Sequence, residues 1–162
     1  MKYLITGGAG FIASHIVDAY LKLGPVVVLD NLSTGFRKNV NKRAKFYKVD
    51  IRNKKRVDEI FAKEKPDVVN HHAAVAEVVK SMINPLKTYE ANIIGTVNIL
   101  EAFTKNKGKR FIFASTGGAL YEGNNKSMSK ESDNILPLSP YGLSKFLGES
   151  LIEFYERLNK FS

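Results

Sequence analysis

The chain has 162 residues, enough for one domain (residues 1–162) with a substantial core, and its apolar runs are too short to span a bilayer. It contains no cysteine, and His15, His71 and His72 lack the spacing of metal ligands, so we expect a cytoplasmic protein without disulfides, a metal ion or a membrane partner. The net charge of +9 suits a phosphate-rich small ligand as well as nucleic acid, but no nucleic-acid-binding motif accompanies the basic clusters, so we expect no nucleic-acid partner.

The first predicted strand, Lys2–Thr6, runs directly into the glycine-rich turn Gly7-Gly8-Ala9-Gly10 and a predicted helix, Gly10–Leu23. A second apolar strand, Val26–Asp30, ends in an acid about twenty residues after the turn. Glycines let the backbone approach a pyrophosphate, and the start of a helix offers it free N–H groups. An acid after the second strand accepts hydrogen bonds from a ribose diol and repels a 2′-phosphate. This spacing predicts a site for NAD rather than NADP.

Strands and helices continue to alternate along the rest of the chain. The predicted strands are Ala44–Val49, Asp67–His71 and Arg110–Ser115, and the predicted helices are Asn53–Glu64, Asn84–Lys105 and Ser139–Asn159. The last helix has Ser139 as its N-cap and Pro140 at its first position, and the polar stretch Glu122–Asp133 before it reads as a surface loop. The alternation predicts an α/β fold, a Rossmann-like doubly wound parallel sheet of about five strands in the order 3-2-1-4-5. The strand at 110–115 would then be an apolar edge.

The last predicted helix carries Tyr141 and Lys145, which are four residues apart and therefore share one helical face. A nearby ammonium lowers the pKa of a phenol, so Tyr141 can take a proton from a hydroxyl group near neutral pH. The strand before this helix ends at Ser115-Thr116-Gly117-Gly118, and ligands of doubly wound sheets bind at the carboxyl ends of the strands. We therefore expect hydroxyl, phenol and ammonium to converge where a nicotinamide would lie.

Taken in order, these motifs resemble the extended short-chain dehydrogenase/reductase superfamily, in its NAD-dependent nucleotide-sugar epimerase/dehydratase branch. The resemblance covers essentially the whole chain. It rests on Thr6-Gly7-Gly8-Ala9-Gly10-Phe11-Ile12, Asp30-Asn31-Leu32-Ser33-Thr34-Gly35, Asp50-Ile51, His71-His72-Ala73-Ala74, Asn92-Ile93-Ile94-Gly95-Thr96, Ser115-Thr116-Gly117-Gly118-Ala119-Leu120-Tyr121 and Ser139-Pro140-Tyr141-Gly142-Leu143-Ser144-Lys145. Within the branch the chain is most similar to UDP-glucose 4-epimerases.

The resemblance implies an NAD site to which all of these segments contribute. Its residues would be Gly7, Gly10, Phe11, Ile12, Asp30, Asn31, Ser33, Thr34, Gly35, Asp50, Ile51, Ala73, Ala74, Asn92, Tyr141 and Lys145. The first four would line the pyrophosphate, Asp30 and the loop after it would hold the adenosine ribose, and Asp50 with Ile51 would face the adenine. Ala73 and Ala74 would let the cofactor pass close to the backbone, and Lys145 would hold the nicotinamide ribose. Asn92 either supports the active-site end or is satisfied by a neighbouring backbone group.

For the reaction, the resemblance implies a nucleotide-sugar 4-epimerase that interconverts UDP-glucose and UDP-galactose through transient oxidation at C4. Tyr141 would be the base and Lys145 would tune it. Thr116 would supply a further catalytic hydroxyl, one residue before the family's usual position, which falls on Gly117. Dehydratases of the branch resemble one another in carrying an Asp-Glu pair where this chain has Gly117 and Gly118, so dehydration is disfavoured. Two alternatives stay open: a non-catalytic NAD-binding module, and an epimerase or dehydratase of another UDP- or dTDP-sugar.

The resemblance also carries two expectations about the whole molecule. Family members continue into a smaller C-terminal domain that grips the nucleotide-sugar, so this chain corresponds to the N-terminal part and is expected to be inactive alone. The family also pairs the helices at 84–105 and 139–159 with their copies in a second subunit, which implies a homodimer.

Overall fold

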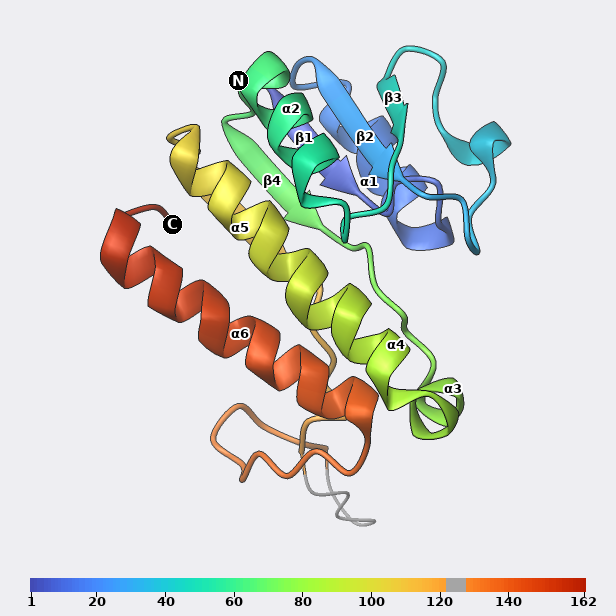
Figure 1. Ribbon diagram of the computed structural model, residues 1–162, viewed down its shortest axis with the longest axis vertical. Helices are drawn as coiled ribbons and strands as arrows, with labels where there is room; N and C mark the ends of the chain where they lie inside the picture. The colour runs from blue at the N-terminus through green and yellow to red at the C-terminus, as the bar shows by residue number, and fades with distance from the viewer. Residues whose placement is uncertain (122–127) are drawn as a thin grey trace.

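The structure is a computed structural model that describes residues 1–121 and 128–162; the part of the expected surface loop at 122–127 lies outside the described residues. One parallel sheet forms the centre of the domain (Figure 1). Its strands are β1 (Tyr3–Thr6), β2 (Val26–Asp30), β3 (Lys45–Lys48), β4 (Val68–His71) and β5 (Arg110–Phe113). The main helices are α1 (Phe11–Tyr20), α2 (Lys54–Glu64), α5 (Gly95–Lys105) and α6 (Pro140–Asn159), and a short 3-10 turn, η1 (Arg37–Asn39), precedes β3.

The strand order is β3-β2-β1-β4-β5 and every pairing is parallel, which confirms the predicted fold and order. The register sets Thr6 of β1 beside Leu29 of β2 on one side and beside His71 of β4 on the other. The carboxyl ends of the central strands therefore meet at one edge of the sheet. This register makes neighbours of three predicted cofactor segments, which follow β1, β2 and β4.

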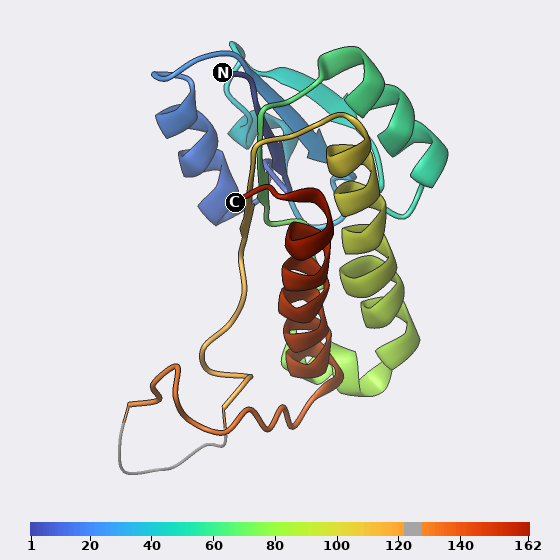
Figure 2. The ribbon, with the colours of Figure 1, turned by 90° about the vertical axis from the view of Figure 1, so that its left-hand side faces the viewer.

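Different helices cover the two faces of the sheet. Figure 2 shows α1 on one side and α2, α5 and α6 together on the other. Successive strand residues alternate between the two apolar clusters, so that Leu4 packs with α2 and α5 whereas Ile5 packs with α1. Because both faces are covered, β1 and β2 are buried along their whole length, as their uninterrupted apolar sequences indicate.

The segment predicted as a single helix at 84–105 is divided in the structure. α4 (Pro85–Tyr89) leads into a π-helical turn, η2 (Glu90–Ile94), which continues as α5. A further short helix, α3 (Val78–Ile83), precedes α4 and is absent from the prediction. A π-turn adds one residue to a turn of helix, and six residues are too few to produce a clear helical period, so neither feature is visible in the apolar pattern. Such turns occur often at functional sites, and Asn92 lies buried in this one.

The strand at the β5 edge is partly covered by the last residues of the chain. Ser162 donates its N–H to the carbonyl of Lys109 at 3.1 Å and accepts the N–H of Phe111 at 2.7 Å, which is the pattern of a parallel bridge. Phe161 is buried with Phe111 in the cluster beneath α5. The expected apolar edge is therefore hydrogen-bonded at its beginning.

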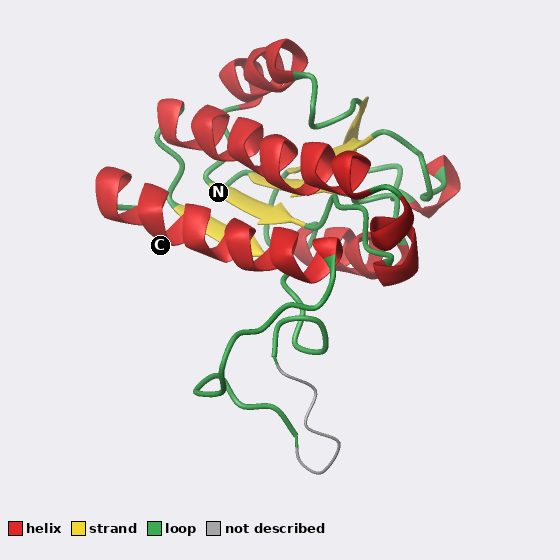
Figure 3. Ribbon diagram, turned by 60° about the horizontal axis from the view of Figure 1, so that its bottom comes forward, coloured by secondary structure: helices red, strands yellow, loops and turns green. Residues whose placement is uncertain are grey.

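Helices α5 and α6 lie side by side on the outside of the domain (Figure 3). In the same view, the described parts of the segment between β5 and α6 project away from the sheet. Residues 114–121 follow β5 directly, so the predicted hydroxyl at Thr116 lies on this segment rather than on a strand.

Candidate functional site

The turn after β1 has the backbone shape that an anion site needs. Gly7 has a positive φ of 71°, and a Cβ at this position would lie 2.8 Å from the Ala73 nitrogen. The Gly10 N–H donates to the Gly7 carbonyl at 2.9 Å and closes the turn. Helix α1 then begins at Phe11, and its N-cap Gly10 has no side chain to satisfy the first N–H groups. These groups and the helix dipole favour a phosphate at this position.

The first two residues of α1 do not pack in the core. Phe11 and Ile12 are 80% and 66% exposed, although both side chains are apolar. They stand next to the glycine turn, as the prediction requires of residues that line a pyrophosphate.

The end of β4 is held beneath this turn by the side chain of Thr6. The Thr6 hydroxyl accepts the N–H groups of His72 and Ala73 at 3.1 and 3.0 Å. It also lies 2.6 Å from Nδ1 of the buried His71. These hydrogen bonds hold the backbone of Ala73 close to Gly7. Only glycine fits at position 7, because any Cβ there would collide with Ala73. The described structure brings the backbone of Ala73 to the turn, and Ala74 follows it.

His71 continues this contact as a hydrogen-bond chain in one direction. Its Nε2 lies 3.0 Å from the Thr96 hydroxyl, which donates to the Asn92 carbonyl at 2.6 Å. The Thr96 oxygen must then receive the Nε2 proton, so Nδ1 is unprotonated and accepts the proton of Thr6. Burial lowers the pKa of His71 to about 3, which keeps the ring neutral. These hydrogen bonds link Thr6, at the end of β1, to Asn92 in the π-turn.

Asp30, the last residue of β2, has a buried carboxylate that accepts fewer hydrogen bonds than it can. Its Oδ2 accepts the Ala9 N–H at 2.9 Å, and its Oδ1 accepts the Leu32 N–H at 2.7 Å. A carboxylate oxygen can accept two hydrogen bonds, so each oxygen retains one position. Two such positions side by side match the two hydroxyls of a ribose. The sequence prediction for Asp30 thus fits the geometry.

The loop after Asp30 is folded back onto the glycine turn. Gly35 lies against Ala9, where a Cβ would be 2.7 Å from the Ala9 carbonyl. Asn31 accepts the Ser33 N–H through Oδ1 at 2.9 Å, which shapes the start of the loop. Ser33 and Thr34 are exposed beside it. All four predicted loop residues therefore lie near the edge at which the strands end.

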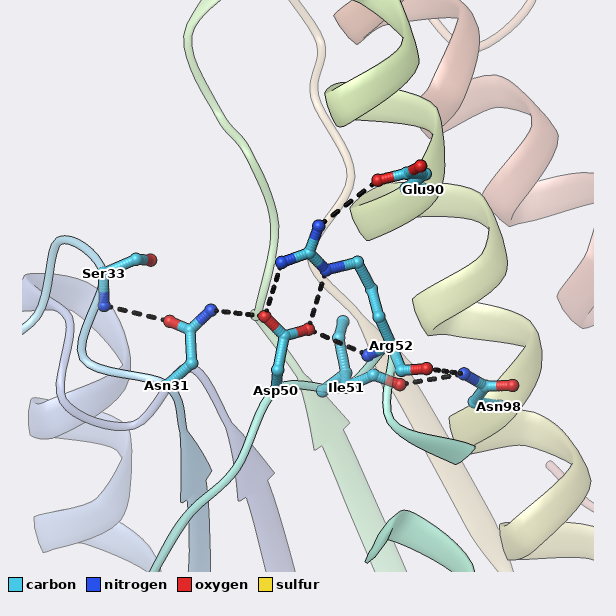
Figure 4. A network of polar contacts seen from close by, with 7 residues as sticks. All are labelled: Asn31, Ser33, Asp50, Ile51, Arg52, Glu90 and Asn98. Carbon is cyan, nitrogen blue, oxygen red and sulfur yellow. Dashed lines mark hydrogen bonds and ion pairs between the residues drawn. The ribbon is translucent and has the colours of Figure 1, made fainter. Parts of the chain in front are cut away.

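Asp50 differs from Asp30 because its carboxylate is fully occupied (Figure 4). Oδ1 accepts the backbone N–H and the Nε–H of Arg52, both at 2.9 Å, and Oδ2 accepts Nη2 of Arg52 at 2.8 Å and Nδ2 of Asn31 at 3.0 Å. Hydrogen bonds from Arg52 hold the pKa of Asp50 well below its usual range. Arg52 also reaches Glu90 through Nη1 at 3.3 Å. The sequence prediction missed Arg52, for which the Asp-x-Arg spacing was the only signal.

The backbone beside Asp50 is held by a separate contact. Asn98 of α5 donates through Nδ2 to the carbonyls of Ile51 and Arg52, at 2.9 and 3.2 Å (Figure 4). Ile51 is buried against α5, and a Cβ on Gly95 would touch its side chain. The two residues expected at the adenine therefore have a fixed backbone.

Tyr141 stands in the first turn of α6, and both of its backbone groups are held by buried side chains. Its N–H donates to the Ser81 hydroxyl at 3.2 Å, and its carbonyl accepts the Ser144 hydroxyl at 2.7 Å. Asn92 donates through Nδ2 to Ser144 at 2.9 Å and binds both backbone groups of Val75. Both interpretations of Asn92 fit these contacts, because its side chain is satisfied by the backbone of Val75 and also supports Tyr141 through Ser144. Asn92 therefore ties α6 to the segment that follows β4.

Lys145 is buried one turn after Tyr141 and points at the end of β5. Its ammonium donates to the Ala114 carbonyl at 2.7 Å and lies 4.6 Å from the centre of the Phe113 ring. Burial lowers the pKa of Lys145 to about 8. The predicted cation therefore reaches the carboxyl edge of the sheet, although it lies on the helix that follows the last strand.

Thr116 lines a cavity of about 430 Å³ between the segment after β5 and helix α6. Ser115, Gly117 and Glu149 also line this cavity. Among the described residues, no hydrogen bond joins Thr116 to Tyr141 or to Lys145. A Cβ on Gly117 would meet nothing within 4 Å, so packing does not explain the glycine. The convergence of hydroxyl and phenol expected from the sequence stays a prediction.

Within residues 1–121 and 128–162, no helix is long and apolar enough to cross a membrane.

A sequence model described as the NAD dependent epimerase/dehydratase family matches residues 3–162. Among curated relatives, a candidate UDP-glucose 4-epimerase of Methanocaldococcus jannaschii is 46% identical over 156 residues, which are 96% of this chain and 51% of the relative. The UDP-glucose 4-epimerase of Lacticaseibacillus casei is 41% identical over 155 residues, 95% of this chain and 46% of the relative. This chain spans about half the length of the curated relatives that it matches.

Solved structures agree with this assignment. The UDP-glucose 4-epimerase of Thermus thermophilus in complex with NAD superposes with a TM-score of 0.96 at 42% sequence identity. The matched region covers 99% of this chain and 52% of the Thermus chain. The Thermotoga maritima enzyme with UDP-glucose gives a TM-score of 0.95 at 42% identity over 99% of this chain and 53% of its own. The glycine turn and the half-filled Asp30 fit the same cofactor. The chain belongs to the NAD dependent epimerase/dehydratase family, and its cofactor is NAD.

Proposed function

We propose that this domain is the cofactor part of a UDP-glucose 4-epimerase, which interconverts UDP-glucose and UDP-galactose. The observation that carries the proposal is the buried ammonium of Lys145 at the carboxyl end of β5, one helical turn after Tyr141. The epimerases named above support the reaction class. Gly117 and Gly118 stand where a dehydratase would need carboxylates, which favours epimerisation over elimination of water.

In this proposal the edge of the sheet binds NAD from the adenine to the nicotinamide. Asp50 accepts the adenine amino group next to Ile51, and Asp30 with the loop at 31–35 holds the adenosine ribose. Gly7, Gly10, Phe11 and Ile12 line the pyrophosphate, and Ala73 and Ala74 leave room for the cofactor beside the backbone. When the cofactor binds, the Lys145 ammonium releases the Ala114 carbonyl and donates to the nicotinamide ribose, close to Tyr141.

The chemistry divides between the cofactor and the protein side chains. When bound, NAD supplies reversible acceptance of the hydride at C4 of the sugar. Tyr141, as the phenolate, takes the proton of the 4-hydroxyl and later returns it to the same oxygen. Lys145 lies one helical turn after Tyr141, and Thr116 donates a hydrogen bond to the 4-oxygen. The keto-sugar turns over between the two steps, so C4 regains its hydrogen on the opposite face.

A second candidate is an NAD-binding module without turnover. It is favoured by the lack of a hydrogen bond from the Tyr141 hydroxyl to Thr116 or Lys145 among the described residues. A different sugar is the third candidate, because an N-acetylated UDP-sugar epimerase of Methanobrevibacter ruminantium also superposes, with a TM-score of 0.90.

We also propose that the helices at 84–105 and 139–159 pair with their copies in a homodimer. Exposed apolar side chains on these segments support this pairing; they include Leu86, Ile94, Phe154 and Leu158. Light scattering tests this homodimer directly, and a monomeric mass would contradict it. The cytoplasmic location expected from the composition stays a prediction.

The function is tested with a longer protein in which residues 1–162 are followed by the C-terminal half of the Thermotoga maritima enzyme, because the 162-residue protein alone is expected to be inactive. This protein is given NAD and UDP-galactose, and UDP-glucose formation is coupled to a UDP-glucose dehydrogenase. Turnover that disappears in Tyr141→Phe supports the epimerase. Calorimetric NAD binding without turnover supports the binding module instead, and turnover only with an N-acetylated UDP-sugar supports the third candidate. No binding of NAD to the folded protein would contradict all three.

A further inference from the structure

The two carboxylates expected to bind adenosine are not equally available. Asp30 has one free acceptor position on each oxygen, whereas all four positions of Asp50 are filled by N–H donors. An adenine amino group is a fifth donor. It can bind Asp50 only if one of the present donors leaves.

The four donors to Asp50 differ in how easily they can leave. The Arg52 N–H is fixed because Asn98 pins the carbonyls of Ile51 and Arg52. Asn31 is constrained by its own bond to Ser33 (Figure 4). The guanidinium of Arg52 lies on a flexible side chain that is 41% exposed, and its departure frees one position on each oxygen of Asp50. The guanidinium of Arg52 is therefore the donor group that can leave Asp50.

Arg52 already has a second carboxylate to receive it. Its Nη1 contacts Glu90 of the π-turn at 3.3 Å, a longer contact than its two side-chain bonds to Asp50. Asp50, Arg52, Asn53, Glu90 and Ile94 line a cavity of about 500 Å³, so the guanidinium has space to move toward Glu90. Leaving Asp50 for Glu90 would keep the guanidinium paired with a carboxylate.

We propose that Arg52 is a specificity-determining residue that competes with adenine for Asp50, and that it moves onto Glu90 when the cofactor binds. The proposal rests on the adenine role of Asp50 stated above under the proposed function. Arg52 lowers the affinity for a base that donates at its 6-position, because that base must displace a bidentate charged contact. It does not disfavour a base with a 6-oxo group, to which a guanidinium can itself donate.

The test compares NAD with its hypoxanthine analogue, in which a 6-oxo group replaces the amino group. Both are titrated by calorimetry into the parent protein, Arg52→Gln and Arg52→Lys, and the measured quantity is the ratio of the analogue's Kd to that of NAD. Since both ligands have the same charge, long-range attraction cancels in this ratio. We expect Arg52→Gln to raise the ratio about tenfold, since a hydrogen bond to a charged group is gained by adenine alone. Arg52→Lys keeps the positive charge but loses the planar group that donates to both oxygens of Asp50, so it should give a smaller rise in the ratio.

Arg56→Gln is the matched control, because Arg56 is an exposed arginine of α2 paired with Glu59. Its ratio should equal that of the parent. An unchanged or lower ratio in Arg52→Gln overturns the proposal while leaving NAD binding, and with it the proposed function, intact. Equal losses for both ligands would make Arg52 a support of the loop, which also overturns it. Failure of the parent to bind either ligand would instead remove the cofactor role itself.

A second readout follows the side chain directly. In the free protein the Arg52 Nε–H is bonded to Asp50, so its ¹⁵N–¹H signal should be protected from exchange with water. Saturation with NAD should shift this signal and change its exchange rate, and Glu90→Gln should weaken NAD binding by removing the alternative partner. A signal that does not respond to NAD contradicts the proposed movement.

Discussion

The adenosine end and the Tyr141 end of the site are built in different ways. At the adenosine end, the consecutive elements β1, the glycine turn, α1 and β2 place Gly7 and Asp30 within one βαβ unit, whereas the segment after β3 is held by a distant residue, Asn98 of α5. The Tyr141 end is assembled from α3, η2, β5 and α6, through Ser81, Asn92 and Ala114. The positions of Gly7 and Asp30 thus depend on local structure, whereas the positions of Tyr141 and Lys145 depend on buried polar contacts between distant segments.

The largest expected effect is at the adenosine end. Asp30→Ala removes two acceptor positions for the ribose and leaves the Ala9 and Leu32 N–H groups without their partner. We expect NAD affinity to fall about 100-fold or more, since each hydrogen bond to a charged group contributes roughly 1.5–3 kcal/mol. Calorimetry measures this, with Asp18→Ala on the exposed side of α1 as the control. A loss under about tenfold would contradict the assignment of Asp30.

At the Tyr141 end, Lys145 should destabilise the fold near neutral pH. Its pKa is lowered to about 8 from 10.5, so the unfolded chain binds more protons between these values and stability rises with pH across this window. Lys145→Met should remove that rise and increase stability at pH 7 by up to about 3 kcal/mol. Urea unfolding at about pH 7 to 10 tests this, with the exposed Lys105→Met as control. If the rise persisted in Lys145→Met, another group would be responsible.

Asn92→Ala tests whether the Tyr141 end depends on contacts between segments. The substitution leaves both backbone groups of Val75 without a partner, and we expect a loss of about 1–3 kcal/mol. Hydrogen exchange should become faster at residues 73–76 and in the first turn of α6, while β1 and β2 remain protected. The exposed Asn159→Ala is the control. Uniform acceleration over the whole sheet would show that the two ends are not separable.

The smallest expected effect on NAD affinity comes from the proposed base itself. Tyr141→Phe removes a single hydroxyl, so the Kd for NAD should change by less than about tenfold while any turnover is lost. Calorimetry and the coupled assay on the same preparation give both quantities. A change in affinity as large as that of Asp30→Ala would remove the contrast between the two ends.

Much of this architecture was predictable because it follows from local rules. Strands that alternate with helical segments favour a parallel sheet, and the observed order is the one expected for a doubly wound fold. Between β2 and β3 the structure has only the 3-10 turn η1. The glycines before α1 and the acid after β2 were equally predictable, because strand, turn and helix follow one another in the chain. The interruption at Glu90–Ile94 was not, since an added residue in one helical turn leaves the apolar pattern almost unchanged.

The sequence by itself determined the fold and the family resemblance, and it predicted the NAD site around Asp30, because these depend on periodicity and on residues close together in the chain. Only the tertiary structure decided how many hydrogen bonds each of the two carboxylates accepts. It also decided that Ser81 holds the Tyr141 N–H across 60 residues, and that Asn92 holds Ser144 across 52 residues. It also decided that Arg52 fills Asp50. Hydrogen bonds between side chains depend on the distance and direction of groups in the folded state, and spacing along the chain does not specify either.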